Sequence, residues 1–345
     1  MEITFESIIG KPELQFNVHE FLAETLKSER VLITGAGGSI GSKIASTIAQ
    51  FPNVSLLATD RDENRLHSLS LDINGTALFE TAQYRILDVR DSIGVEKVIN
   101  EYKPTMVIHT AALKHLAILE MQPREAYLTN FLGTRNLLTS SAKNNVGRFL
   151  NISTDKAANP SSILGKTKLM AEILTTDFRR KGFRYFTNVR FGNVFNSKGS
   201  VIETFVHQIN AGLPVLLTDP EVSRFFMKLE EAVNLSLLAV IVNEGDVHIT
   251  DLGKPIKVIE IIMKLMEILE KKSEIVIVGL RKGEKIREEL WSSEEIVFQT
   301  KEKGVAALNL TFSNHETFYD SEDPLTDEVA VEEINRFLKD SKVGM

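Results

Sequence analysis

Three polar side chains that can hold or move a proton stand together at Thr154, Asp155 and Lys156. They follow the apolar run 148–152, and a further lysine, Lys168, comes later in the same region. An acid next to an amine can serve as acid and base on neighbouring atoms of one substrate if a closed cleft holds both groups. In isolation, Asp155 and Lys156 are better explained as a solvated turn, so the surrounding elements decide between the two interpretations.

The surrounding sequence alternates short apolar runs with amphipathic stretches between residues 31 and 191. Such runs predict buried strands, and the stretches between them predict helices. Repeated strand–helix order predicts an α/β fold of the Rossmann type, in which helices cover both faces of a doubly wound parallel sheet. Ligands bind at the carboxyl ends of the strands in such folds. The expected strands are 31–35, 54–59, 84–88, 105–110, 148–153 and 185–191, and the expected helices include 40–50, 92–102, 123–144 and 161–181.

A glycine-rich turn, with Gly35, Gly38 and Gly41, lies between the first expected strand and the first expected helix. Gly35 permits a tight turn, Gly38 lets a phosphate approach the backbone, and Gly41 lets the helix pack closely on the strand. A pyrophosphate would then lie at the N-terminus of the helix. The alternative, a flexible turn without a ligand, is disfavoured by the strand–turn–helix setting.

Two aspartates end the next two expected strands. Asp60 can bind both adenosine ribose hydroxyls and repel a 2′-phosphate, which favours NAD, while the adjacent Arg61 leaves NADP open. Asp60 also fits the N-cap of the helix that DRDENRLHSL opens, and the two roles can coincide. Asp88 fits equally well an acceptor for the adenine amino group or an N-cap. The expected cofactor-binding residues are Gly35, Gly38, Ser39, Ile40, Gly41, Asp60, Arg61, Asp88, Val89, Ala111 and Lys168.

The alternation loosens after about residue 195, where Pro214, Pro220 and Pro255 separate shorter elements. This change predicts a smaller, mixed C-terminal lobe that completes a substrate cleft. The expected parts are an N-terminal extension at 1–29, a dinucleotide-binding Rossmann domain at 30–195 and a substrate lobe at 196–345.

Composition narrows the function further. The chain has 345 residues, no cysteine and a net charge of −7, which excludes disulfides and thiolate metal sites and argues against nucleic acid as a partner. The seven histidines lack metal-ligand spacing with nearby carboxylates, so no metal site is expected. The N-terminus lacks a secretory pattern, and no apolar run approaches the roughly 18–20 residues of a membrane span, which predicts a cytoplasmic protein.

Longer motifs follow one another along the chain: IIGKPELQF, TGAGGSIGS, HTAALKHLAILEMQP, TNFLGTRNL, STDKAANP, VRFGNVFNSKGSVI, TDPEVSRFFM and GLRKGEKIREEL. Together they resemble the extended short-chain dehydrogenase/reductases, and within them the polysaccharide-biosynthesis nucleotide-sugar 4,6-dehydratases. The resemblance covers nearly the whole chain. It implies UDP-N-acetylglucosamine as the usual substrate, a tightly held nicotinamide cofactor, and a UDP-4-keto-6-deoxy-hexosamine product.

The resemblance also implies catalytic roles. The reaction oxidises C4 by hydride transfer, eliminates water across C5–C6 and returns the hydride to C6. Oxidation makes the C5 proton acidic, so a base near C5 and an acid near O6 are useful. By resemblance Asp155 is the acid at O6, Lys156 is the base at C5, and Thr154 contacts the sugar O4. Lys168 would bind the nicotinamide ribose and place positive charge near the reacting hydroxyl.

Position 164 departs from the family pattern. Most members have a tyrosine base four residues before the second lysine, whereas this chain has Leu164. The O4 proton must therefore go elsewhere, and we expect Asp155 to accept it, directly or through Thr154, while Lys168 stabilises the negative charge. The long, membrane-embedded branch of the family has methionine at this position, so an apolar residue marks a subfamily and not an inactive enzyme.

The substrate contacts are also expected by resemblance. Asn193 would lie near the diphosphate, Arg224 and Arg281 would bind phosphate, and Glu284 would accept from the uridine ribose hydroxyls. The alternative for Arg224, Arg281 and Glu284 is a set of surface salt bridges.

Three further residues lie in the same motifs. Lys114 is expected to contact the sugar or a phosphate, and His115 is expected to pack or hydrogen-bond more than to act as a base. Asn130 is expected to bridge or cap within the Rossmann core, with an indirect role in catalysis.

Two other functions stay open. One is a related nucleotide-sugar enzyme, either a 4-epimerase, which needs no C5 base, or a dehydratase that also inverts C5. The other is a non-catalytic NAD-binding sensor, which needs none of the catalytic residues. Leu164 favours retention at C5.

Assembly is expected by resemblance alone. Helices 92–102 and 123–144 are those that pair in dimers of this superfamily, so we expect a homo-oligomer. The segment IIGKPELQFN resembles the linker before the catalytic domain of the membrane-embedded branch, and Met1 favours a soluble short member over an excised domain.

Overall fold

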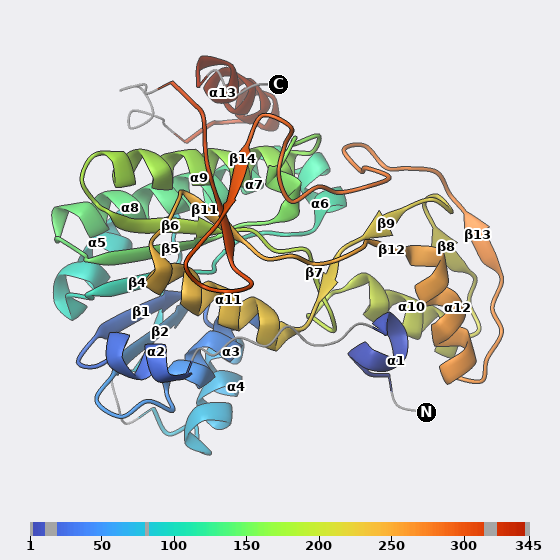
Figure 1. Cartoon of the computed structure of the whole chain (residues 1–345), viewed down its shortest axis with the longest axis horizontal. Helices are drawn as coiled ribbons and strands as arrows, with labels where there is room; N and C mark the ends of the chain where they lie inside the picture. Colours follow the sequence, from blue (N-terminus) through green and yellow to red (C-terminus); the bar gives the residue numbers. More distant parts are fainter. Residues whose placement is uncertain (1–2, 11–18, 80–82, 314–322, 342–345) are drawn as a thin grey trace.

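A computed structural model describes residues 3–10, 19–79, 83–313 and 323–341. Within these residues, nine strands form one sheet in the order β14-β15-β11-β6-β5-β4-β1-β2-β3 (Figure 1). Its parallel core, from β3 to β6, has the strand order of a doubly wound fold, which confirms the expected fold class. The strands are β1 (Arg30–Thr34), β2 (Ser55–Asp60), β3 (Tyr84–Ile86), β4 (Met106–His109), β5 (Arg148–Ile152), β6 (Tyr185–Val189), β11 (Val247–Ile249), β14 (Ile296–Gln299) and β15 (Ala306–Asn309).

Helices cover both faces of the sheet because neighbouring residues of each buried strand point to opposite sides. Leu32 of β1 packs in one core with α5, α8, α9 and α13, whereas Val31 and Ile33 pack in a second core with α2, α3 and α11. The helices of the first face are α5 (Ser92–Tyr102), α6 (Leu116–Met121), α7 (Pro123–Ala126), the π-helix η1 (Tyr127–Leu132), α8 (Gly133–Lys143), α9 (Ile163–Arg180) and α13 (Asp327–Asp340). Those of the second face are α2 (His19–Thr25), α3 (Ser39–Ile48), α4 (Glu63–Asn74) and α11 (Leu229–Val242).

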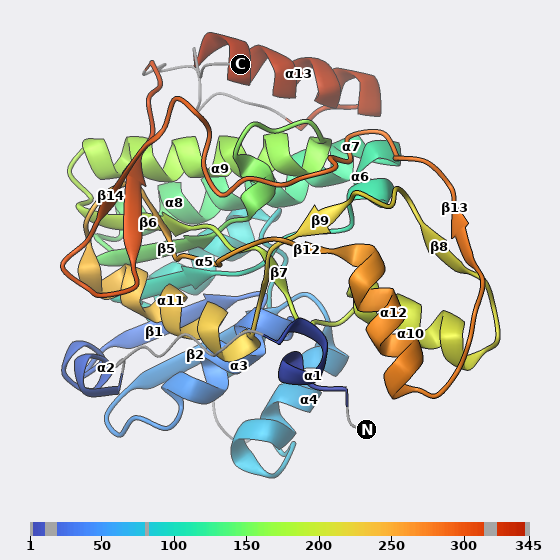
Figure 2. The same cartoon turned by 45° about the vertical axis from the view of Figure 1, so that its right-hand side comes forward.

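A smaller lobe lies beside the sheet (Figures 1 and 2). It has its own apolar core, in which Phe5 and Ile8 of the N-terminal helix α1 pack with Phe205, Ile261 and Ile262. Its elements are α1 (Phe5–Ile9), β7 (Asn193–Val194), α10 (Val201–Asn210), β8 (Val215–Leu217), β9 (Ser223–Arg224), β10 (Phe226–Met227), β12 (Ile256–Lys257), α12 (Val258–Ile268) and β13 (Ile275–Ile277).

The chain crosses between the two lobes more often than the sequence predicts. Once the chain has formed β7 to β10 and α10 of the small lobe, β11 pairs with β6 of the sheet. Strands β15 and β14 then extend the sheet in antiparallel pairing. The expected division into 30–195 and 196–345 therefore does not match the sheet. The expected extension at 1–29 is also split, because α1 joins the small lobe and α2 covers the sheet. Residues 11–16 of the IIGKPELQF motif lie outside the described residues.

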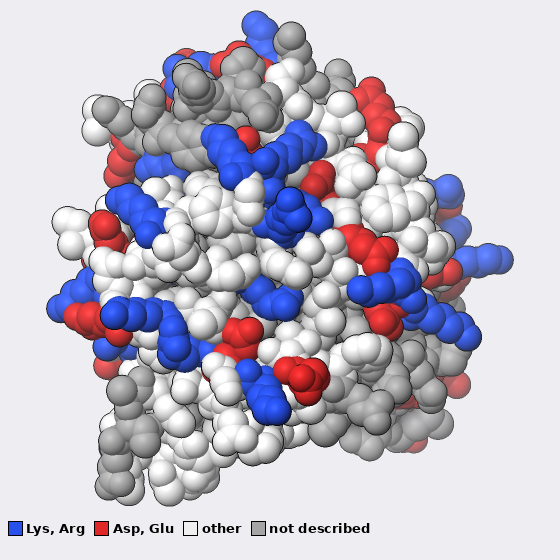
Figure 3. Space-filling view, turned by 60° about the vertical axis from the view of Figure 1, so that its left-hand side comes forward, with Lys and Arg blue, Asp and Glu red and all other residues white. Residues whose placement is uncertain are grey.

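The charged side chains on one face of the molecule are mixed in sign. Lysine and arginine are interspersed with aspartate and glutamate on the face in Figure 3, without a continuous basic stripe. In the described ranges, every helix is too short or too polar to cross a bilayer. Helices α5 and α8 pack on each other; the expected dimer contact through this region stays a prediction.

Candidate active site

A cavity of about 730 Å³ opens at the carboxyl ends of the parallel strands, between the sheet and the small lobe. It lies where β1 and β4 are neighbours and the winding of the sheet reverses, which is the usual ligand site of doubly wound folds. All the residues expected to bind the cofactor line it, as do Thr154, Lys156, Lys114, His115 and Asn193. The fold therefore places around one cavity residues that the sequence predicts to act together.

The glycine turn packs so closely against its neighbours that side chains at Gly35 and Gly41 would clash with the backbone. Gly35 has φ +69°, and a Cβ there would lie 2.5 Å from the Ala111 nitrogen. A Cβ on Gly41 would lie 2.3 Å from the Gly35 carbonyl oxygen. Gly38 is the N-cap of α3 and provides no capping side chain, so the N–H groups at the start of this helix face the cavity without a side-chain partner.

Asp60 holds the glycine turn and does not cap a helix. Its Oδ2 accepts from the Gly37 N–H (2.9 Å) and its Oδ1 from the Asp62 N–H (3.0 Å). The N-cap of α4 is Asp62, which accepts from the N–H groups of Asn64 and Arg65. The N-cap interpretation of Asp60 is therefore wrong, and its carboxylate lies in the cavity wall.

Asp88 is likewise not an N-cap, because Asp91 caps α5. The Asp88 carboxylate accepts from Arg90 Nε (2.9 Å) and Nη2 (2.5 Å) at the cavity edge. Burial alone would raise the pKa of Asp88, but the bonds from Arg90 outweigh that effect and lower it. Asp88 is therefore a fixed negative group beside the expected adenine position.

The expected catalytic residues Asp155 and Lys156 lie on a 3₁₀-helix, η2 (Asp155–Ala157), at the end of β5, and we call this segment with Thr154 the catalytic turn. Asp155 is 0% exposed and does not line the cavity, whereas Thr154 and Lys156 do. Asp155 Oδ1 accepts from Thr154 Oγ1 (2.9 Å) and from Lys156 Nζ (2.9 Å). Helix α9 packs directly on the turn, since a Cβ on Gly165 would lie 2.2 Å from the Lys156 carbonyl oxygen. Thr154 and Lys156 therefore connect Asp155 to the cavity.

A third charged group contacts this turn. Glu288, on the segment 283–289 that we call the strap, has Oε1 3.8 Å from Lys156 Nζ. The Glu288 side chain is 2% exposed, and burial raises its pKa. Asp155 Oδ2 and Glu288 Oε2 are both buried without a hydrogen-bond partner. Such groups are few in native proteins, and a role in catalysis is one of the explanations for them.

Lys168 and Leu164 extend from successive turns of α9 into the cavity wall. Both are buried, and burial lowers the pKa of Lys168 to about 8 although Glu172, one turn further on, partly offsets this effect. Leu164 provides only apolar surface where the family has a tyrosine. No titratable side chain therefore replaces that tyrosine at the same position.

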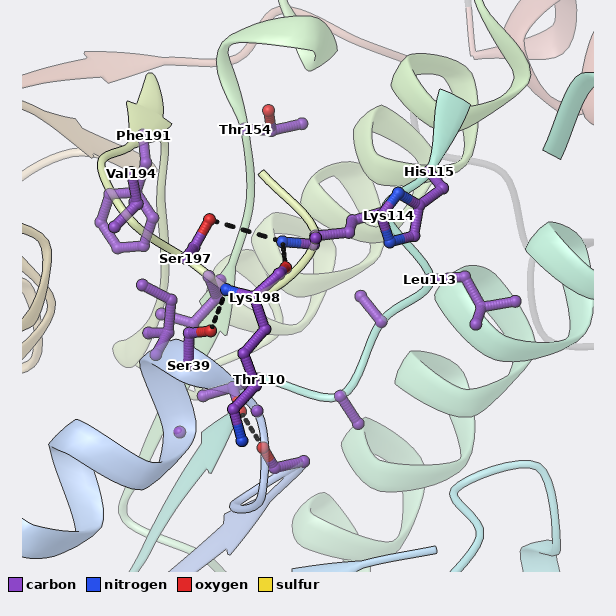
Figure 4. Close-up of a pocket in the computed structure, with 18 of the residues that line it drawn as sticks. Ser39, Thr110, Leu113, Lys114, His115, Thr154, Phe191, Val194, Ser197 and Lys198 are labelled. Carbon is purple, nitrogen blue, oxygen red and sulfur yellow. Dashed lines mark hydrogen bonds between the residues drawn. The ribbon is translucent and has the colours of Figure 1, made fainter. Parts of the chain in front are cut away.

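A loop from the small lobe covers the glycine turn (Figure 4). Lys114 Nζ donates to the Lys198 carbonyl oxygen (2.6 Å), and the Lys198 N–H donates to Ser39 Oγ (3.1 Å). The His115 ring packs against Gly199, where a Cβ would lie 2.8 Å from the ring. Lys114 and His115 thus join the two lobes at the cavity.

Asn130 binds the segment after β4 that carries Lys114 and His115, and so bridges within the Rossmann core. It lies in the π-helix η1, a distortion often found at functional sites. Its Oδ1 accepts from the Leu113 N–H (2.8 Å), and its Nδ2 donates to the Leu113 carbonyl (3.1 Å).

The other expected substrate residues are not in the cavity wall. Arg224 is buried and pairs with Glu284 (3.4 Å), which also accepts from Thr218 Oγ1 (3.0 Å). Arg281 is exposed, and its backbone N–H donates to Glu284 Oε2 (3.3 Å). These residues form a separate group on the small lobe, in which Arg224 and Glu284 make a salt bridge that is largely buried and not on the surface as the alternative expected.

Sequence reasoning missed Glu288 as a member of the site. Its signal was present in the motif GLRKGEKIREEL, but nothing in that string distinguishes Glu288 from Glu289, which is exposed. Among the described residues no cluster of histidine and carboxylate side chains could hold a metal ion.

Comparison with known proteins gives consistent matches. The model of a family described as "Polysaccharide biosynthesis protein" matches residues 31–309. The capsular polysaccharide biosynthesis protein CapD of Staphylococcus aureus is 36% identical over 86% of this chain and 50% of its own length. The chain thus spans about half the length of this relative, and the same share of the probable polysaccharide biosynthesis protein EpsC of Bacillus subtilis. A Rickettsia rickettsii protein named UDP-glucose 4-epimerase is 34% identical over 77% of this chain and 78% of its own.

Solved structures share the fold. Pen from Bacillus thuringiensis superposes with a TM-score of 0.72 at 30% identity, over 81% of this chain and 88% of its own. DesIV, a dTDP-glucose 4,6-dehydratase from Streptomyces venezuelae with NAD bound, has a TM-score of 0.65 at 20% identity, over 76% of this chain and 88% of its own. The Thermus thermophilus UDP-glucose 4-epimerase in complex with NAD has a TM-score of 0.65 at 22% identity, over 76% and 90%.

Proposed function

This chain belongs to the polysaccharide biosynthesis protein family, and within that family we propose that it is a UDP-N-acetylglucosamine 4,6-dehydratase. The observation that carries the proposal is the hydrogen-bonded group of Thr154, Asp155 and Lys156 at the cavity, next to the buried Lys168. Removing water across C5–C6 needs an acid and a base close together, and Asp155 and Lys156 are an acid and a base in contact.

The cavity fits a dinucleotide, which we propose to be NAD. Side chains would fill the space at Gly35 and Gly41, and the start of α3 offers N–H groups suited to a pyrophosphate. Asp60 offers a carboxylate where an adenosine ribose would lie and disfavours a 2′-phosphate. Bound there, NAD would accept a hydride from C4 of the sugar and return it to C6. The bound NAD of DesIV and of the Thermus epimerase supports this choice.

Thr154 is the group that gives Asp155 access to the substrate. Since Asp155 is buried and its Oδ1 accepts from the Thr154 hydroxyl, a proton leaving O4 would pass through Thr154 to the carboxylate. Asp155 then holds the proton that the departing 6-hydroxyl needs. The Lys168 ammonium stabilises the negative charge that develops on O4. This route needs no tyrosine at position 164.

The sugar nucleotide would lie with its hexose at Thr154 and Lys156 and its diphosphate towards Asn193 and Lys114. Asn193 begins β7, which pairs with β10 of the small lobe, so its position depends on how the two lobes close on the ligand. Arg224 and Glu284 bind each other in the described structure. They would reach the uridine end only after exchanging that contact for the ligand.

The test is proton NMR of UDP-N-acetylglucosamine incubated with the protein, with and without added NAD. We expect a new C6 methyl doublet and loss of the C6 hydroxymethyl signals. An unchanged sugar in the presence of folded, NAD-bound protein would refute the proposal and favour the non-catalytic sensor.

A second candidate is a 4-epimerase, which the name of the Rickettsia relative, UDP-glucose 4-epimerase, favours. The same spectra separate it from the dehydratase, because an epimerase changes the H4 coupling constants and forms no methyl group. The contact between Asp155 and Lys156 supports the dehydratase, since inversion at C4 uses no base at C5.

A further inference from the structure

The strap (residues 283–289) fastens the small lobe to the catalytic turn. On one side, the Ser223 N–H donates to the Ile286 carbonyl (2.9 Å) and Arg224 Nη1 donates to the same oxygen (3.1 Å). On the other side, Gly283 lies so close to Ser162 that a Cβ would approach the Ser162 Cβ to 2.8 Å. The remaining contacts are Ser161 Oγ to the Gly283 carbonyl (2.9 Å), Lys285 Nζ to the Ala158 carbonyl (3.2 Å) and Asn159 Nδ2 to Glu289 Oε2 (2.6 Å).

These contacts place Glu288 against Lys156 in a nearly closed space. Glu288 Oε1 lies 3.8 Å from Lys156 Nζ, and Oε2 has no partner. The other charged groups that face Glu288 are Asp155 on the catalytic turn, Arg224 on β9 and Lys285 on the strap. Of these, Lys285 donates to the Ala158 carbonyl and Arg224 pairs with Glu284, so Lys156 is the cation in position to exchange a proton with Glu288.

The proposed reaction imposes a requirement on Lys156. A base at C5 must be an uncharged amine when it takes the proton, yet an amine beside two carboxylates is held as an ammonium. Asp155 cannot relieve this, because it is occupied by the proton from O4 at that stage. Lys156 therefore needs another group that accepts its surplus proton inside the site.

We propose that Glu288 is a positioning residue that acts through Lys156, taking up the proton that Lys156 must lose to become a base and returning it at the end of each turnover. This inference rests on the proposed dehydratase function and deepens it. A shift of about 1 Å closes the distance of 3.8 Å to that of a hydrogen bond. Catalytic hydrogen bonds are often long without a ligand and tighten when the substrate binds.

The protons balance over the cycle. At rest Asp155 and Glu288 are carboxylates and Lys156 is an ammonium. The O4 proton reaches Asp155, Lys156 gives a proton to Glu288, and the free amine takes the C5 proton. The C5–H electron pair forms the C5=C6 double bond as the C6–O bond breaks, and Asp155 gives its proton to the departing oxygen, which leaves as water. NAD bound in the cavity would carry the hydride taken from C4 and return it to C6. The C5=C6 electron pair then moves to C5, where it takes a proton from Lys156, and Lys156 recovers its own proton from Glu288.

The test isolates the C5 step by starting from the product. UDP-4-keto-6-deoxy-N-acetylglucosamine, supplied by synthesis, is incubated with the NAD-bound protein in deuterium oxide, and loss of the H5 signal is followed by NMR between pH 6 and pH 8. Every protein in this test carries Asp155→Asn, because the amide stands for an Asp155 that already holds its proton and cannot take one from Lys156. The reference for each exchange rate is the Asp155→Asn protein with wild-type residues at positions 288 and 289. We expect the Glu288→Gln variant to exchange H5 about 100-fold more slowly than this reference at pH 7. The variant's rate should then rise about tenfold per pH unit as bulk solvent removes the lysine proton, whereas the reference rate stays nearly flat.

The matched control is Glu289→Gln, the same change one residue along the strap. Its amide oxygen can still accept from Asn159, so exchange should remain within about threefold of the reference. A Glu288→Gln variant that exchanges H5 at the reference rate would overturn the inference, as would a slow variant whose rate does not recover with pH. Failure of the wild type to form a 6-methyl sugar from UDP-N-acetylglucosamine would instead overturn the proposed function, so the two failures are distinguishable.

Discussion

Two buried clusters in this protein each place one cation between two carboxylates, and they differ in how completely the cation is bound. In the first, Arg190 lies between Glu172 and Glu295, and its guanidinium makes bonds of 2.7–3.1 Å to both carboxylates and to the Leu290 carbonyl. In the second, Lys156 lies between Asp155 at 2.9 Å and Glu288 at 3.8 Å, and each carboxylate keeps one oxygen without a partner.

The difference follows from the chemistry of the two cations. An arginine stays protonated in proteins and its planar fork suits two carboxylates at once, so the Arg190 cluster fixes charge and holds β6 to α9 and to the segment before β14. A lysine loses its proton readily in a buried site. The Lys156 cluster is therefore suited to moving protons, and its incomplete bonding is what makes such movement feasible. Buried charge is common to both clusters, whereas incomplete pairing distinguishes the Lys156 cluster at the candidate active site.

The largest effect is expected for Asp155→Asn. An amide of the same shape cannot take the O4 proton or supply one to O6, so kcat should fall by about 10³- to 10⁴-fold while the protein stays folded. Steady-state rates and circular dichroism measure the two quantities. A fully active Asp155→Asn variant would remove Asp155 from the proton path and with it the contrast between the two clusters.

The free energy of unfolding should depend more on the Arg190 cluster than on the Lys156 cluster. Arg190→Met leaves two buried carboxylates without a cation, so the free energy of unfolding should fall by about 3–5 kcal/mol. Lys156→Met is the matched change, and it should cost under about 2 kcal/mol because the Lys156 side chain is 20% exposed and its partner can take up a proton. Urea denaturation of both variants tests this, and equal losses would contradict the division into a fixed and a mobile cluster.

Lys168 is a further buried side chain, and its positive charge is costly there. Its pKa of about 8 is below the unfolded value of about 10.4, so the unfolded chain binds more protons between these pH values and stability should rise with pH across that window. Below pH 8 the cost of the buried charge is fully present. Lys168→Met should therefore be more stable than the wild type at pH 7 by up to about 3 kcal/mol, with the gap closing towards pH 10. Thermal melts at pH 7, 8.5 and 10 measure the gap, and a constant difference would show that burial does not lower the pKa of Lys168.

The smallest effect is expected at position 164. Leu164 is buried in the cavity wall and contributes packing, so Leu164→Met should change stability by less than about 1.5 kcal/mol and leave kcat within a few fold. A fall in kcat comparable to that of Asp155→Asn would mean that the shape of the side chain at position 164, and not the two clusters, limits the reaction.

The sequence predicts the parallel strands of the Rossmann core well. It does not predict the later strands β11, β14 and β15 that join the same sheet. Strands β1 to β6 and helix α5 lie within two residues of their expected positions, because each buried strand is a local apolar run between amphipathic stretches. Strands β11, β14 and β15 pair with the sheet only after the chain has built parts of the small lobe, and no local pattern records that pairing. Asp60 and Asp62 are both residue types that suit an N-cap. The N-cap of α4 is Asp62, because Asp60 is the last residue of β2.

The residues of the candidate site also differ in whether the sequence predicts them. The glycine turn could be identified from its spacing, and the Thr154–Asp155–Lys156 run from the resemblance of its motif to the family. Glu288 could not be identified, because its inward orientation depends on contacts of the strap with Ser161 and Ser162, far away in the sequence. The burial of Asp155, which makes Thr154 its route to the cavity, was equally beyond the reach of sequence patterns.

The most direct test of the account is proton NMR of UDP-N-acetylglucosamine turned over in deuterium oxide by the wild type and by Lys156→Met. We predict that the wild type forms a 6-methyl sugar whose methyl signal is a singlet, because C5 receives deuterium from an exchangeable base, and that the variant forms none. A methyl signal of equal size from both proteins, or a C4-inverted sugar without a methyl group, would contradict the account.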